Sequence, residues 1–181
     1  MRIFVLITLI LACSVTAASQ ALSSQTRAQE LAASFNKFKS LSKEKHGVTK
    51  EKYKDVHSEP VVKQNIGDYS GVYEVSYLSF GIKLQVESAG QIQGSGYEPA
   101  GEDNQQRTFR LEQARITEGL LTATKVYANG ATEKFEGVFI NRTERKSPND
   151  TGVTAFGLGV LLSTPREHGG ITYDKLFYER K

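Results

Sequence analysis

The amino-acid sequence predicts an all-β protein, an eight-stranded antiparallel up-and-down barrel preceded by one N-terminal helix. Three observations lead to this prediction. From about residue 68 onward apolar and polar residues alternate, short turn-forming segments separate the alternating stretches, and glycines lie inside several of those stretches. A period of two residues is typical of strands that bury one face.

Residues 1–21 have the pattern of a secretory signal peptide. Arg2 precedes an uncharged apolar run from Ile3 to Ala12, and small and polar residues follow this run up to Ala21. A run of this length is too short for a transmembrane helix, which needs about 20 residues. We therefore expect a secreted or periplasmic protein.

The only cysteine, Cys13, gives this segment a second interpretation. Cleavage after Ala17, Ala18 or Ala21 would remove it and release a free protein. Alternatively, Ala12-Cys13 resembles the end of a bacterial lipobox, so that Cys13 would be lipidated and hold the protein on the envelope. Leu11 departs from that pattern, in which a smaller residue is usual at this position.

Residues 22–62 are predicted to form a basic helical lead-in or linker. Apolar residues recur at helical spacing from about residue 23 to residue 42, namely Ala28, Leu31, Ala32, Phe35, Phe38 and Leu41. Seven lysines lie between Lys37 and Lys54. Residues 22–55 hold eight basic against four acidic residues, whereas residues 56–181 hold 14 basic against 16 acidic ones. The lysines belong either to a solvated tether or a helix that lies on its own acidic barrel, or to a contact site for an anionic membrane surface or glycan. Nucleic acid is not an expected partner.

Residues 63–181 are predicted to form the barrel. The expected strands are residues 69–77, 80–87, 91–97, 108–116, 120–127, 133–141, 153–162 and 171–179. Most connections between them are short, and Asn129-Gly130 suits the type I′ turn of a tight hairpin. Strands joined this closely are antiparallel neighbours.

Closure of the sheet is expected because an open eight-stranded meander would expose two edges. Six glycines inside the strands favour the bends that closure requires, namely Gly71, Gly94, Gly96, Gly137, Gly157 and Gly159. A β-sandwich of two packed sheets is the alternative architecture.

The segment Gly67-Asp68-Tyr69-Ser70-Gly71-Val72-Tyr73 resembles the first strand of the calycins, the lipocalin and avidin group. Tyr73 stands where those proteins carry a tryptophan. The resemblance implies a ligand cavity at the open end of the barrel and no catalytic residues.

Candidate site residues are few. Tyr69, Tyr73 and Tyr77 share one face of a predicted strand, where they either pack in the core or line a pocket for a small hydrophobic molecule. Asn141 and Asn149 begin glycosylation sequons. The three histidines are far apart in the sequence, and we predict no catalytic residue, metal site or cofactor.

Three functions fit these observations. The first is a non-enzymatic secreted or periplasmic barrel that binds a small hydrophobic ligand. The second is an envelope-associated interaction protein that binds through its basic N-terminal helix and uses a filled barrel as a scaffold. The third is a hydrolase that uses carboxylates such as Glu98 or Asp174.

Overall fold

The computed structural model describes residues 23–181 apart from 46–47, 76–77, 101–104, 148 and 169–170. Within this part of the chain one α-helix, residues 23–34, and one 3-10 helix, η1 (Ile66–Tyr69), accompany a ten-stranded antiparallel sheet. The predicted signal segment, with Cys13, lies outside the described residues.

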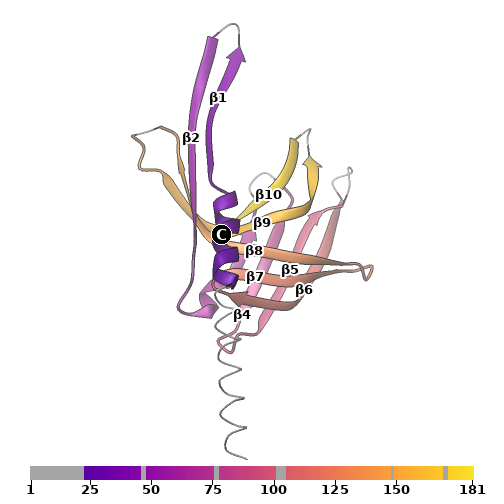
Figure 1. Cartoon of the computed structure of the whole chain (residues 1–181). Helices are drawn as coiled ribbons and strands as arrows, with labels where there is room; N and C mark the ends of the chain where they lie inside the picture. Colours follow the sequence, from indigo (N-terminus) through magenta and orange to yellow (C-terminus); the bar gives the residue numbers. More distant parts are fainter. Residues whose placement is uncertain (1–22, 46–47, 76–77, 101–104, 148, 169–170) are drawn as a thin grey trace, which may run out of the picture.

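The strands are β1 (Lys37–Lys45), β2 (Val48–Pro60), β3 (Gly71–Glu74), β4 (Gly81–Val86), β5 (Ile92–Pro99), β6 (Gln106–Thr117), β7 (Leu120–Tyr127), β8 (Thr132–Arg145), β9 (Val153–His168) and β10 (Ile171–Arg180). From β3 to β10 each strand pairs with the next one in the chain, and β10 pairs with β3. This ring of pairings closes an eight-stranded barrel (Figure 1). The predicted barrel is confirmed, and the ring excludes the alternative of two separate sheets.

The first predicted strand begins later than expected. Tyr69, predicted at its start, belongs instead to η1. The Asn65 side chain accepts a hydrogen bond from the backbone N–H of Gly67 at 3.0 Å, and Ser70 N–H donates to Gly67 O at 2.9 Å. These local bonds form a tight helical turn, so extended pairing begins only at Gly71.

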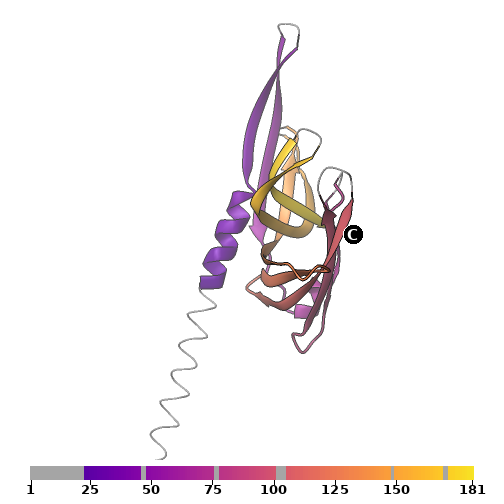
Figure 2. The ribbon, with the colours of Figure 1, turned by 90° about the vertical axis from the view of Figure 1, so that its right-hand side faces the viewer.

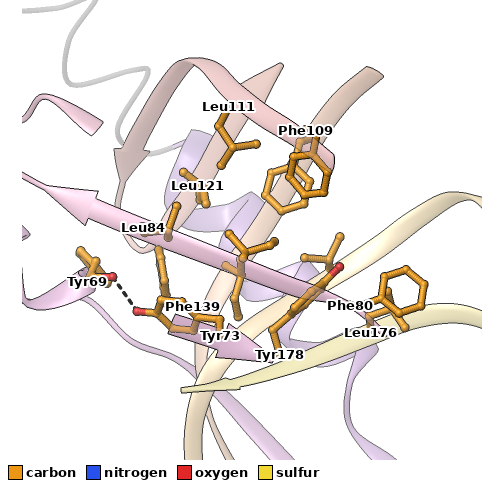
Figure 3. Packing of buried hydrophobic residues seen from close by; sticks show 14 of the residues in the cluster. Tyr69, Tyr73, Phe80, Leu84, Phe109, Leu111, Leu121, Phe139, Leu176 and Tyr178 are labelled. Atoms are coloured by element: carbon orange, nitrogen blue, oxygen red, sulfur yellow. Dashed lines mark hydrogen bonds between the residues drawn. The ribbon is translucent and has the colours of Figure 1, made fainter. Parts of the chain in front are cut away.

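Alternate residues of the barrel strands point inward and form one apolar core (Figure 3). Its aromatic rings pack on one another, for example Tyr69 on Phe139 with centroids 4.3 Å apart. At two of the glycines a side chain would overlap with an aromatic ring or with the backbone of a neighbouring strand. A Cβ at Gly96 would lie 2.4 Å from the Phe109 ring, and one at Gly157 would lie 2.2 Å from the Tyr178 carbonyl oxygen.

The N-terminal helix lies on the outside of the barrel (Figure 2). Its buried residues are Ala28, Leu31 and Ala32, and together with Phe35 they pack on Leu120, Val138 and Ile140. Polar contacts hold both ends of the helix. Arg27 pairs with Glu136 at 2.7 Å, and Lys175 Nζ donates to the carbonyl of Ser34 at 2.7 Å, where a helix end leaves acceptors unpaired. This helix is not long and apolar enough to span a membrane.

The predicted helical lead-in is wrong beyond residue 34. Phe38 and Leu41, expected on the apolar stripe of the helix, lie in β1, and β1 and β2 form a long hairpin that projects from the barrel (Figure 1). The chain leaves the helix because Phe35 packs over Gly159, while the Asn36 side chain accepts a hydrogen bond from Ser58 N–H at 2.6 Å. We call residues 37–60 the ribbon.

We predict that Leu31→Ala destabilises the protein by about 3 kcal/mol, because it leaves a cavity between the helix and the barrel. Leu31 is buried at this contact, whereas Gln29 on the same helix is exposed. The exposed-site change Gln29→Ala should alter the free energy of unfolding by less than about 0.5 kcal/mol. Denaturant unfolding measures both variants, and equal effects would contradict the docked helix.

Candidate functional site

The predicted tyrosine site lies at the η1 end of the barrel. Tyr69 and Tyr73 are buried, and the Tyr73 hydroxyl donates to the Tyr69 carbonyl at 2.6 Å (Figure 3). The Tyr69 hydroxyl donates to Val61 O at 3.1 Å and accepts from Lys63 N–H at 2.7 Å. Both hydroxyls therefore bind the protein's own backbone and hold η1 against the barrel end. Tyr77 lies outside the described residues.

Burial changes the acidity of these phenols. It raises the pKa of Tyr73 to about 12, although the charge of Arg180 opposes the shift, and it also raises the pKa of Tyr69. Burial disfavours the charged phenolate, so both tyrosines stay neutral well into the alkaline range.

A second group of residues lies further along the interior and was not predicted as a group. The network consists of Glu98, Arg107, Lys125, Tyr127 and Glu133. The Glu98 carboxylate is 1% exposed and accepts from three donors: Arg107 Nε at 2.7 Å, Lys125 Nζ at 2.8 Å and the Tyr127 hydroxyl at 3.0 Å. We call this group the Glu98 network.

Aromatic rings surround the cations of the Glu98 network. Lys125 Nζ lies 4.6 Å from the centroid of Phe109, and the Arg107 guanidinium lies 4.3 Å from that of Tyr127. Contacts of this kind stabilise a cation that has left water. Two cations and two carboxylates balance, so the interior holds charged groups without a net charge.

The Tyr127 hydroxyl lies between two carboxylates, 3.0 Å from Glu98 and 2.8 Å from Glu133. A phenol has one proton to donate, so the two carboxylates share it. Burial, followed by the hydrogen bond to Glu133, raises the pKa of Tyr127 far above its ordinary value. The hydroxyl is thereby kept as a permanent donor inside the barrel.

The Glu98 network is a set of groups that satisfy one another. Its most exposed cation is Arg107, whose side chain is 39% exposed, whereas that of Lys125 is 4% exposed. Glu98 is thus held as a structural acceptor, and the other carboxylate considered for hydrolysis, Asp174, is exposed on β10. The sequence signal for the network was charge at inward positions of neighbouring strands.

The remaining predicted sites lie on the surface. Asn141 is exposed on β8, and Asn149 is exposed in the connection to β9. His57 lies 2.9 Å from Glu59, and both are exposed on β2. Among the described residues no three histidine, cysteine or acidic side chains gather into a group that could hold a metal ion.

The register of the ribbon places its seven lysines together. Every second residue of β1 is a lysine at four positions, namely Lys37, Lys39, Lys43 and Lys45. On β2, Lys54 is opposite Lys39 and Lys50 is opposite Lys43. Directly opposed residues of an antiparallel pair lie on the same face, and successive residues alternate between faces. We call the resulting surface the lysine face; its members are Lys37, Lys39, Leu41, Lys43, Lys45, Val48, Lys50, Lys52, Lys54 and Val56.

The other face of the ribbon has the opposite character. It contains Glu44, Glu51 and Asp55 together with Phe38, Ser40, Ser42, Thr49 and Tyr53. The segregation of charge is therefore complete between Lys37 and Asp55. Two pairs of lysines, Lys39–Lys54 and Lys43–Lys50, are directly opposed in this register. Like charges at directly opposed positions disfavour a strand pair.

No protein-family model, curated protein or solved structure matches this chain. The function must therefore be inferred from its own residues.

We predict that Glu98→Gln destabilises the protein by about 3 kcal/mol, because it leaves Lys125 buried without its carboxylate. Adding Lys125→Met removes the unpaired ammonium, and the double variant should recover most of that loss. Denaturant unfolding of both variants gives the coupling between the two sites. A double variant less stable than Glu98→Gln would contradict the pairing.

We predict that stability falls between pH 10 and 12. The pKa of Tyr73 rises from its ordinary value of 10.0 to about 12 in the folded protein, so the folded state retains a proton that the unfolded chain loses. The contribution, about 2 to 3 kcal/mol, is complete below pH 10 and disappears as the pH approaches 12. Unfolding measured over this range should have a smaller slope in Tyr73→Phe, and an unchanged slope would refute the assignment.

Proposed function

We propose that this protein is an exported, non-enzymatic interaction protein in which the barrel is a filled scaffold and the lysine face binds anionic surfaces. The observation that carries the proposal is the register, which gathers all seven lysines of residues 37–54 on one face of the ribbon. The N-terminal segment, with its signal pattern, supports a location outside the cytoplasm.

The interior of the barrel supports the scaffold role. The hydroxyls of Tyr69 and Tyr73 bind backbone groups, and the charged groups of the Glu98 network bind one another. These contacts stabilise the barrel and leave the recognition of partners to the surface.

The end of the ribbon next to the barrel is attached to it by strand pairing. Six residues of β2, from Asp55 to Pro60, pair with β8, and Val56 and Ser58 are buried there. The ribbon therefore continues the sheet of the barrel instead of hanging from a free linker. Residues 56–181 hold two more acidic than basic residues. An anionic surface would therefore attract the lysines of the ribbon and repel the barrel.

The resemblance to calycins adds a second proposal, that the barrel itself is of the calycin type and accepts a small hydrophobic ligand at the end opposite η1. The closed eight-stranded arrangement and the segment Gly67–Tyr73 support it. We place it second, because the inward side chains of Glu98 and Lys125 are charged and bind each other inside the barrel, so a hydrophobic ligand would meet a charged pair there.

The proposed function is tested with a soluble sulfated polysaccharide and the exported chain. Replacing Lys39, Lys43, Lys50 and Lys54 with glutamine should lower the affinity at least tenfold at low salt, because each lysine near an anionic surface contributes about 1 kcal/mol. Binding of the unaltered chain should weaken as salt is raised to about 0.5 M and screening shortens. The substitutions also remove cross-strand repulsion, so the ribbon is not weakened by them.

The matched control changes four exposed lysines of the barrel, Lys83, Lys134, Lys146 and Lys181, to glutamine. The net charge changes by the same amount in both variants. The control should bind within about twofold of the unaltered chain, since its lysines are scattered. Equal losses in the two variants would show that total charge, and not the lysine face, governs binding.

A further inference from the structure

We infer that the partner of the lysine face is an anionic phospholipid bilayer, with Leu41 and Val48 entering its interfacial layer. This inference rests on the proposed function and names its partner. Two observations support it: the arrangement of the lysine positions in two rows, and the presence of the aliphatic residues Leu41 and Val48 among them.

The arrangement is two-dimensional. Neighbours on one face of a strand lie about 6.8 Å apart, twice the rise per residue, and directly opposed residues of two strands lie about 5 Å apart. The register therefore gives two rows of lysine positions, four on β1 and three on β2, and such an arrangement suits a surface of phosphates better than a single line of them.

The composition of the lysine face does not suit nucleic acid. A two-stranded ribbon can enter the major groove of DNA, but bases are read there by arginine, asparagine and glutamine. Single strands are held by stacking on aromatic rings. The lysine face has none of these residues, and Phe38 and Tyr53 lie on the opposite face of the ribbon.

The two aliphatic residues point to a lipid surface. Leu41 is opposite Lys52 in the middle of the face, and Val48 is opposite Lys45 beside the tip of the hairpin. On a soluble polyanion these positions gain nothing from being apolar. At a bilayer they bury apolar area in the acyl boundary, while the stems of the lysines extend to the phosphates.

An anionic surface should also favour the pairing of β1 with β2. A two-stranded ribbon is marginally stable in water, and like charges at directly opposed positions, such as Lys39–Lys54 and Lys43–Lys50, disfavour a strand pair. Phosphates between opposed lysines relieve their repulsion. Because ribbons twist along their length, a flat bilayer meets one stretch of the face, and the stretch near the tip combines Lys43, Lys50 and Val48.

The test uses the absence of tryptophan from the chain. Leu41→Trp places a single fluorophore on the lysine face, and Tyr53→Trp places one on the opposite face of the same ribbon. Each exported variant is mixed with vesicles of neutral lipid, with vesicles containing about 30% anionic lipid, and with the soluble sulfated polysaccharide. Lipids that carry a bromine quencher in the acyl chain report contact with the acyl boundary.

The expected result is a blue shift and quenching of the indole fluorescence of Leu41→Trp with anionic vesicles only, and no comparable change for Tyr53→Trp. In the otherwise unaltered chain, replacing both Leu41 and Val48 with serine should lower vesicle binding at least tenfold and leave polysaccharide binding within about twofold.

Three outcomes would overturn the inference. Equal shifts in the two tryptophan variants would show that the lysine face is not the side that meets the lipid, and vesicle binding without a shift in Leu41→Trp would show that this position stays outside the acyl boundary. Salt-sensitive binding to the polysaccharide without any binding to vesicles would also overturn the inference, while the proposed function would stand. Absence of binding to both would end both proposals.

Discussion

The rest of the structure depends on strand β8, which forms backbone hydrogen bonds with three other strands. Along one edge its first half pairs with β7 and its second half with β2, and along the other edge residues Gly137–Glu144 pair with β9. The pairing with β9 closes the barrel, and the pairing with β2 attaches the ribbon. Inward, Phe139 packs on Tyr69; outward, Val138 and Ile140 receive the N-terminal helix. One strand of 14 residues thus joins barrel, ribbon and helix into a single body.

The barrel could be predicted from the sequence because its signals are local. Alternation along Ile82, Leu84 and Val86 identifies a strand, and Asn129-Gly130 identifies a hairpin, without knowledge of distant residues. The ribbon was missed because Phe38 and Leu41 continue the helical spacing of Leu31 and Phe35. Lysines with a period of two were present in the same segment, but the attachment of this segment as strands depends on the pairing of β2 with β8, which lies about 85 residues away along the chain.

The candidate sites could be predicted only in part, for a related reason. Alternation correctly indicated that Tyr73 is buried, but it does not reveal that its hydroxyl is used by the Tyr69 carbonyl. Glu98 and Lys125 are 27 positions apart and meet because β5, β6 and β7 are neighbours with a fixed register. In the sequence, the only indication of this pair was a charged residue at an inward position of a strand. Its partner becomes identifiable only when the register of three strands is known.

The position of β1 at the end of the strand order gives its lysines a further consequence. The outer edge of β1 pairs with no other described strand, and an open edge is a template on which a second copy can add a strand. Two ribbons that paired edge to edge would bring their rows of lysine positions alongside each other. Repulsion between like charges would oppose such pairing in free solution. An anionic surface that neutralises those rows removes this protection, so crowding of the protein on such a surface would favour continuous sheets between molecules.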